Sequence, residues 1–242
     1  MLYIFFMEIT KYYSPNYIKK VRSGSSITMI IIHYTGMQSE RESLKRLTSI
    51  KSKVSAHYLV GRNGGILNLV EPRYVAWHAG KSMWKKNENL NKNSIGIELV
   101  NKGHKFGYQK FTKIQIKNLI FLCGKLKKKY KIKNQYILGH SDIAPLRKID
   151  PGEKFPWHHL SINGIGNYPK KIVVNSRYKK AQNNDQFFKN LQKIGYRYLN
   201  SKYKTKIVKN FQRKYRQKKI NGIIDFETLK LSQILSKSSN YT

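Results

Sequence analysis

The segment 139–152, Gly-His-Ser-Asp-Ile-Ala-Pro-Leu-Arg-Lys-Ile-Asp-Pro-Gly, constrains the fold of this chain more than any other. It follows an apolar run, residues 136–138, that is typical of a short buried strand. We therefore expect His140 to emerge at a strand end, where sites on α/β folds are commonly placed. Pro145 and Pro151 disfavour regular helix, so the rest of the segment is predicted to be an ordered loop.

The side chains in and before this loop match a hydrolytic zinc site. His140 and Asp150 carry groups that bind zinc well, whereas Lys148 is a cation that a metal repels unless an anion lies between them. Another β-branched run, residues 28–32, leads directly into His33 and predicts a second buried strand. If the two strands are parallel, His33 and His140 lie at the same sheet edge. Two histidines and one aspartate leave a fourth zinc position open for water, although each residue alone is more simply explained as a hydrogen-bonded side chain.

Five short motifs then occur in a characteristic order. They are His33-Tyr34-Thr35, Ser55-Ala56-His57-Tyr58, Ala76-Trp77-His78-Ala79-Gly80, Ser94-Ile95-Gly96-Ile97-Glu98, and Gly139-His140 through Asp150-Pro151-Gly152. Over about residues 25–160 the chain closely resembles the zinc-dependent N-acetylmuramoyl-L-alanine amidases of type 2. The resemblance implies an α/β fold, with a central mixed β-sheet flanked by helices, and one catalytic zinc ion.

The resemblance also implies roles for individual residues. By position, the zinc ligands are His33, His140 and Asp150, the catalytic residues are Glu98 and Lys148, and the substrate-binding residues are Tyr34, Trp77, His78 and Ala79. None of the five ligand and catalytic positions is altered. An aspartate at position 150 argues against the related eukaryotic peptidoglycan-recognition amidases, which typically have a cysteine there.

Glu98 lies within an apolar run, residues 95–100, that predicts a buried strand. An ionised carboxylate is costly there unless it is paired or near a metal, and burial raises its pKa toward the range useful for a general base. We therefore expect Glu98 to take a proton from the zinc-bound water. The resulting hydroxide would attack an amide carbonyl, and Glu98 would return the proton to the leaving amine. Zinc and Lys148 would stabilise the oxyanion.

The chain of 242 residues has a formal net charge of +36. Residues 170–242 contribute 19 Lys and Arg against 3 Asp and Glu, so the charge is not confined to one part. Such a surface attracts polyanions, including nucleic acid, anionic lipid headgroups and anionic wall polymers. Compositional drift is the favoured main cause, because Lys, Ile, Asn and Tyr are all abundant. Glu98, Asp142 and Asp150 have nevertheless remained acidic, which points to a role for these carboxylates. We expect Asp142 to orient His140 or to cap the following turn.

Cysteine content and the N-terminus bear on the compartment. Cys123 is the single cysteine, so no intramolecular disulfide can form. It lies in an apolar helical pattern that follows Thr112-Lys113-Ile114-Gln115, a capping-box start, and this place predicts a core residue. Residues 2–7 are apolar but too short for a signal peptide, and no later run is long enough to span a membrane. These features favour a cytoplasmic protein; the alternative is a periplasmic or secreted one with no readable signal.

Other local patterns predict the remaining elements of the first domain. Residues 40–51 read as a helix, and residues 57–62 and 66–70 as two strands joined by Asn63-Gly64-Gly65, a strong hairpin signal. His57 lies where the resembled family has its Ser-Ala-His-Tyr strand, so we interpret it as a structural residue or as a neighbour that supports the site, and not as a metal ligand.

The domains are predicted as a catalytic domain (1–168), a linker (169–183) and a three-helix domain (184–242). Helices are expected at residues 185–194, 205–215 and 225–235, with Asp225 as an N-cap. This last part resembles the three-helix peptidoglycan-binding module more weakly, and a basic DNA-binding three-helix unit is the alternative.

The sequence therefore predicts a hydrolase that cleaves the amide between the lactyl group of N-acetylmuramic acid, or its 1,6-anhydro form, and the L-alanine of the stem peptide. The expected partners are peptidoglycan or muropeptides, and the enzyme is expected to be a monomer. A non-catalytic peptidoglycan-binding protein is disfavoured because the ligand and catalytic set is complete. A nucleic-acid-binding protein is suggested by the charge alone.

Overall fold

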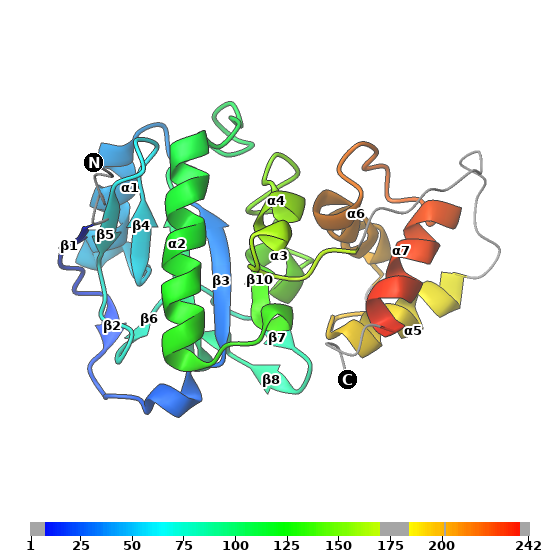
Figure 1. Ribbon diagram of the computed structural model, residues 1–242, viewed down its shortest axis with the longest axis horizontal. Coiled ribbons are helices and arrows are strands. Elements are labelled where there is room, and N and C mark those ends of the chain that lie inside the picture. The colour runs from blue at the N-terminus through cyan, green and yellow to red at the C-terminus, as the bar shows by residue number, and fades with distance from the viewer. Residues whose placement is uncertain (1–7, 170–183, 201, 238–242) are drawn as a thin grey trace, which may run out of the picture. The chain divides into compact units, whose positions relative to one another are not determined.

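The computed structural model describes residues 8–169, 184–200 and 202–237, which form two compact units (Figure 1). The first unit comprises Met1–Gly80 and Asn91–Ile132, and the second comprises Lys81–Leu90 and Lys133–Thr242. The apolar N-terminal run at residues 2–7 and all but the first residue of the predicted linker lie outside the described residues. No helix in the described ranges is both long and apolar enough to cross a membrane.

The first unit is built on a mixed β-sheet. Its strands are β1 (Ile9–Lys11), β2 (Tyr17–Ile18), β3 (Met29–Tyr34), β4 (Tyr58–Val60), β5 (Ile66–Asn68), β6 (Val75–Ala76) and β9 (Ser94–Leu99). In this unit the main sheet runs in the order β1-β5-β4-β9-β3. The β4–β5 pair is antiparallel, whereas β1–β5, β4–β9 and β9–β3 are parallel. The predicted mixed sheet and the hairpin at Asn63-Gly64-Gly65 are confirmed.

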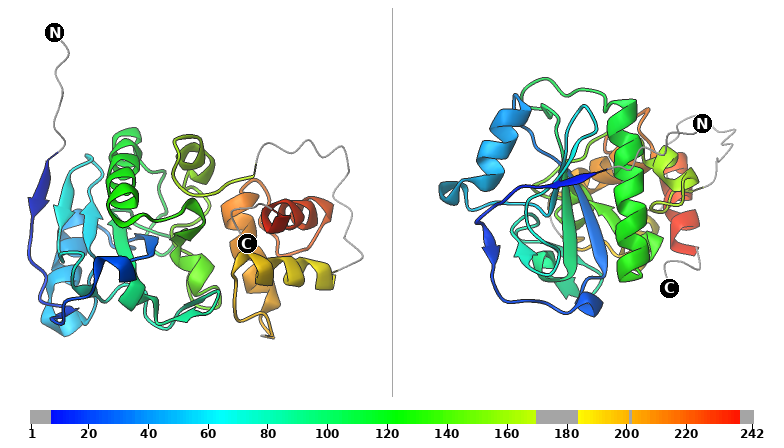
Figure 2. Two further views of the ribbon diagram at one scale, coloured as in Figure 1. Left: turned by 60° about the horizontal axis from the view of Figure 1, so that its bottom comes forward. Right: turned by 60° about the vertical axis from the view of Figure 1, so that its left-hand side comes forward.

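Two helices, α1 (Glu40–Thr48) and α2 (Lys113–Tyr130), lie on opposite sides of this sheet (Figure 2). Leu47 of α1 packs in a buried cluster with Leu59 of β4. Short 3-10 helices at Gly24–Ser26, Ile50–Ser52 and Leu90–Asn93 connect the elements. The flanking helices predicted from the sequence are thus present.

Helix α2 is tied to the sheet by Gln115. Thr112 caps the helix as predicted, with its side chain accepting from the backbone N–H of Gln115. Only this half of the predicted capping box is present, because the Gln115 side chain does not bond back to the backbone of Thr112. Its amide donates instead to the carbonyls of Val60 and Val100, at 3.0 and 3.1 Å, where β4 and β9 end. Cys123 is fully buried on α2, as expected, and burial raises the pKa of its thiol to about 12.

The second unit is mainly helical. Its elements are β7 (Met83–Trp84), β8 (Asn87–Glu88), a 3-10 helix (Asn134–Tyr136), β10 (Ile137–Gly139), α3 (His140–Ile143), α4 (Trp157–Ile162), α5 (Asn184–Ile194), α6 (Lys204–Tyr215) and α7 (Phe226–Lys237). Helices α5, α6 and α7 match the three helices predicted for the C-terminal part to within two residues. The ring of Phe211 on α6 meets those of Phe187 and Tyr196 with centroids 5.2 and 6.4 Å apart. The N-cap at Asp225 is confirmed by its bond from the N–H of Thr228 at 3.0 Å.

The segment after β10 differs from the prediction in one respect. Residues 140–143 form the short helix α3, where we expected loop throughout. Pro145 lies beyond the end of this helix, so it limits α3 to one turn and does not prevent it. The side chain of Asp142 accepts from the backbone N–H of Gly139 at 2.8 Å, which caps the turn.

Candidate active site

His33 of the first unit lies near the end of β3 and is buried, with 1% of its surface exposed. The parallel register of β3 and β9 pairs His33 directly with Glu98. Register partners on neighbouring parallel strands project to the same face of a sheet, so an imidazole and a carboxylate stand side by side there. The flanking partners Ile32 and Ile97 are fully buried in the core and fix this register.

His78 packs against His33. Nδ1 of His78 is 3.1 Å from Nε2 of His33, and the two rings meet edge to face with centroids 5.2 Å apart. The His78 ring also lies directly over Gly96, where a Cβ would approach it to 2.3 Å. Gly96 is therefore required in its motif by close approach, since any side chain there would displace His78 from His33.

His57 is held by structural hydrogen bonds, in agreement with the sequence interpretation. Its Nδ1 accepts from the N–H of Gly96 at 3.0 Å, so Nε2 carries the proton and lies 3.1 Å from the carbonyl of Tyr74. Burial, reinforced by the Arg22 guanidinium 2.9 Å from Nε2, lowers the pKa of His57 to about 3. This imidazole is thus neutral, with both nitrogens engaged.

The other predicted substrate-binding residues differ in exposure. The Tyr34 ring is partly exposed, and its hydroxyl is 2.9 Å from Nδ1 of His104. Trp77 is also partly exposed, whereas Ala79 is fully buried. The side-chain oxygen of Asn91 accepts from the backbone N–H groups of His78 and Ala79 at 3.1 and 2.7 Å, which fixes this loop.

In the second unit, His140 and Asp150 lie together. Nδ1 of His140 is 3.1 Å from Oδ2 of Asp150, and both residues are buried. Lys148, partly exposed, lies two residues before Asp150. Gly139 is needed here for the same reason as Gly96, because a Cβ at this position would meet the ring of Pro151 at 2.7 Å.

Asp142 joins this segment to the C-terminal helices. Besides capping α3, its carboxylate accepts from Nζ of Lys214 at 2.6 Å and from the hydroxyl of Tyr196 at 2.6 Å. We expected Asp142 to orient His140 or to cap the turn, and the capping role is the one observed. The Lys214 ammonium is buried and also lies 4.3 Å from the ring centroid of Trp157, so two interactions compensate its burial.

Asn210 of α6 holds the backbone around Lys148. Its side-chain amide donates to the carbonyls of Pro145 and Lys148 at 2.8 and 2.9 Å, and only 1% of the residue is exposed. Sequence reasoning did not identify Asn210, Lys214 or Asn91. An asparagine or a lysine in a helix of so basic a chain carries no local signal of such a role.

The metal-binding capacity agrees with the prediction. Within the ranges that the structure describes, His33, His140 and Asp150 are grouped so that they could hold a metal ion, and all three are buried. Two imidazoles and one carboxylate form a donor set that suits zinc.

Comparison with known proteins identifies the family. The sequence model of the family described as N-acetylmuramoyl-L-alanine amidase matches residues 23–153. The chain is 34% identical over 229 residues to N-acetylmuramoyl-L-alanine amidase AmiD of Escherichia coli K12, covering 86% of this chain and 82% of the relative. It is also 34% identical over 162 residues to the 1,6-anhydro-N-acetylmuramyl-L-alanine amidase AmpD of Haemophilus influenzae, covering 60% of this chain and 85% of that protein.

Solved structures agree with the sequence matches. The complex of E. coli AmiD with the substrate anhydro-N-acetylmuramic acid-L-Ala-D-gamma-Glu-L-Lys has a TM-score of 0.81 at 32% identity, over 90% of this chain and 91% of the other. AmpDh3 of Pseudomonas aeruginosa has a TM-score of 0.79 at 28% identity, over 93% and 97%. From these matches and its intact motifs, this chain belongs to the N-acetylmuramoyl-L-alanine amidase family and is an amidase.

Proposed function

We propose that this amidase is a zinc enzyme that cleaves the bond between the lactyl group of 1,6-anhydro-N-acetylmuramic acid and the L-alanine of a stem peptide. The solved AmiD complex holds a substrate of this kind, and the similarity to it extends over 90% of the chain. The observation that carries the proposal is the pairing of His33 with Glu98 in the β3–β9 register, which sets a base beside a metal ligand.

In this proposal His33, His140 and Asp150 hold the zinc ion. When bound, zinc supplies a Lewis acid and lowers the pKa of a coordinated water to about 7. His78 supports His33 from the side, and Gly96 leaves the room that this contact needs. Loss of a neighbour that orients a metal ligand typically lowers metal affinity or activity by about 10–100-fold.

The catalytic groups of the chain are Glu98 and Lys148. Glu98 accepts a proton from the attacking water and returns it to the amine of L-alanine as that group leaves. Lys148 places a positive charge where the amide oxygen becomes negative, and Asn210 anchors the backbone carbonyl of that lysine. Tyr34 and Trp77, both partly exposed, supply ring surface for the muramyl peptide, and the loop of His78 and Ala79 completes this surface.

The test combines zinc analysis with hydrolysis of the anhydro-muramyl tripeptide and of its N-acetylmuramyl counterpart, before and after chelation. We expect about one zinc per chain, activity that chelation abolishes and zinc restores, and faster hydrolysis of the anhydro substrate. Glu98→Ala should keep its zinc and lose turnover by at least roughly 100-fold. Glu88→Ala, which removes an exposed carboxylate of β8, is the matched control and should keep full activity.

Each contrary result would exclude one particular part of the proposal. Activity that survives complete metal removal would refute zinc dependence, and retained turnover in Glu98→Ala would remove Glu98 from the mechanism. Bound zinc with no hydrolysis of either substrate would favour the alternative of a peptidoglycan-binding protein.

A further inference from the structure

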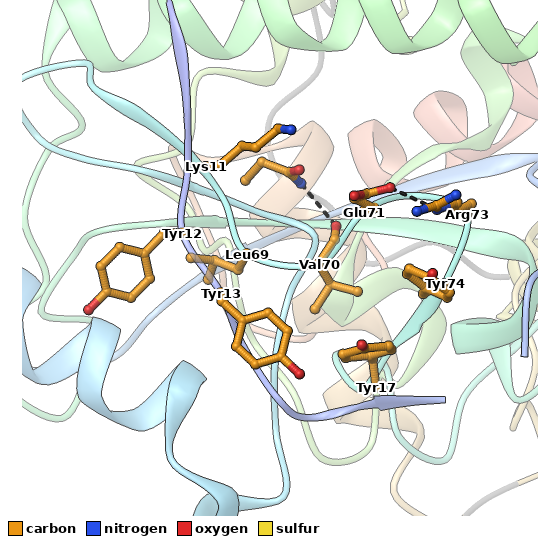
Figure 3. Close-up of a pocket in the computed structure, with 10 residues that line it drawn as sticks. Lys11, Tyr12, Tyr13, Tyr17, Leu69, Val70, Glu71, Arg73 and Tyr74 are labelled. Atoms are coloured by element: carbon orange, nitrogen blue, oxygen red, sulfur yellow. Dashed lines mark hydrogen bonds and ion pairs between the residues drawn. The ribbon is translucent and has the colours of Figure 1, made fainter. Parts of the chain in front are cut away.

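A cavity lies in the first unit, between the chain that follows β1 and the loop that follows β5 (Figure 3). Its volume is about 410 Å³, within the range of about 300–1,000 Å³ that small-molecule sites occupy. Strands β4 and β9 separate β5 from β3, the strand of His33, in the sheet order. The cavity is therefore distinct from the His33–Glu98 site of this unit.

Four tyrosines line the cavity: Tyr12, Tyr13, Tyr17 and Tyr74. Tyr12 and Tyr13 are 47% and 66% exposed, which leaves large ring areas in water. The rings of Tyr17 and Tyr74 lie 5.0 Å apart at 40°, and Tyr13 meets Tyr17 edge to face at 6.2 Å. Tyrosine combines a rigid apolar face with a hydroxyl and loses little conformational entropy on binding. Such a cluster is suited to a ligand that has both an apolar face and hydrogen-bonding groups.

The polar lining is close to neutral. Arg73 and Glu71 form a 2.8 Å ion pair, with side chains 57% and 49% exposed, and the Arg73 guanidinium lies 5.0 Å from the ring centroid of Tyr74. With Lys11 the cavity carries two cations and one anion. Single-stranded nucleic acid binds grooves of unpaired positive charge beside stacking rings, whereas here one cation is already paired with a carboxylate. In a chain of net charge +36, this composition favours an uncharged ligand.

We propose that this cavity binds a saccharide, specifically an uncharged stretch of N-acetylated amino-sugar glycan. The C–H face of a pyranose ring stacks on the tyrosines, while its hydroxyl and acetamido groups bond to Glu71, Arg73 and the tyrosine hydroxyls. The source of the glycan, the sugar chain of peptidoglycan, rests on the proposed function. The proposal that the cavity binds a saccharide does not rest on that function, because it follows from the residues that line the cavity.

The experiment measures binding of chitotetraose, the β-1,4-linked tetramer of N-acetylglucosamine, to the full-length protein by calorimetry and saturation-transfer NMR. Chitotetraose has no lactyl–alanine amide, so its binding is measured whether or not the protein is an amidase. Tyr13→Ala removes the most exposed ring of the cavity and is expected to weaken binding roughly tenfold. Phe121→Ala removes a 39% exposed ring on α2, away from the cavity, and should bind as the wild type does.

Parallel titrations use a single-stranded oligothymidylate. We expect its binding to be unchanged by Tyr13→Ala and to fall with added salt. Absence of chitotetraose binding, or equal binding by wild type and Tyr13→Ala, would overturn the proposal. Oligothymidylate binding that depends on Tyr13 would also overturn it, by assigning the cavity to nucleic acid.

Discussion

The two units hold their zinc-ligand candidates in different ways. In the first unit, His33 lies on a six-residue strand, and the β3–β9 register and the neighbouring His78 determine its position. In the second unit, His140 begins a four-residue helix and Asp150 lies in the loop beyond it. Polar groups of this segment bond to the C-terminal helices, up to 72 residues away in sequence. The first arrangement depends on regular backbone pairing, the second on long-range side-chain contacts.

The largest expected effect tests the second arrangement through Asp142. Asp142→Ala leaves the buried Lys214 ammonium without its carboxylate and removes the acceptor of Gly139 and Tyr196. Removing one partner of a buried pair costs about 3–5 kcal/mol, so urea unfolding should show a large fall in the free energy of unfolding. Asp185→Ala, at an exposed carboxylate of α5, should change it by less than about 0.5 kcal/mol.

A second variant distinguishes the ion pair from the packing around it. The double variant Asp142→Asn with Lys214→Met removes the buried ammonium and keeps one side-chain oxygen to accept from the N–H of Gly139. The new amide NH2 can donate to the hydroxyl oxygen of Tyr196, which donates to the carboxylate in the native protein. Because no uncompensated charge remains, this double variant should be more stable than Asp142→Ala. A loss under about 1 kcal/mol in Asp142→Ala would show that the C-terminal helices do not stabilise the segment through this carboxylate.

The first arrangement should instead be sensitive to acid through His57. Its folded-state pKa of about 3 lies below the unfolded value of 6.5, so below pH 6.5 the unfolded chain binds a proton that the native protein excludes. Stability therefore falls as pH drops from 6.5 toward 3, by about 1.4 kcal/mol per pH unit and about 2 kcal/mol by pH 5. Unfolding curves at pH 7 and pH 5 measure this loss of stability. In His57→Gln the loss between the two pH values should be smaller by about 2 kcal/mol.

The protonation state of His57 can also be read directly. Nitrogen chemical shifts of its ring should remain those of the neutral imidazole at pH 5, with the proton on Nε2. An imidazolium signal at that pH would contradict the burial argument and remove this source of acid sensitivity.

The same contrast explains which features could be predicted from the sequence. Strands β3 and β9, helix α2 and the hairpin follow from periodicity and turn residues that lie next to one another in the chain. The ligand candidates were found because their residue types follow apolar runs and match family motifs. Even the glycines of these motifs have a local reason, since Gly96 and Gly139 each leave room for one neighbouring ring.

The contacts that support the second unit could not be predicted in this way. Asp142 and Lys214 are 72 residues apart, and nothing in the local sequence separates Lys214 from the other lysines of so basic a chain. Helix α3 was missed because Pro145 suggested a loop, although one capped turn fits before it. Gln115 was misinterpreted because a side chain in a helical first turn can also bond to a strand that only the fold brings near.

A last prediction concerns Asn210, and it separates support of the site from support of the fold. Asn210→Ala should cost about 1–3 kcal/mol, because the buried carbonyl of Pro145 and the partly buried carbonyl of Lys148 lose their donor. It should also lower kcat/KM roughly tenfold or more, because the backbone of Lys148 is no longer anchored. Asn190 is the matched control, since its side chain bonds to Ser232 at 3.0 Å within the C-terminal helices. Asn190→Ala should lose similar stability in urea and keep full kcat/KM at temperatures where both variants are folded. Equal losses of activity in both would mean that the C-terminal helices act on the site only through overall stability, whereas a loss confined to Asn210→Ala would show that they position Lys148.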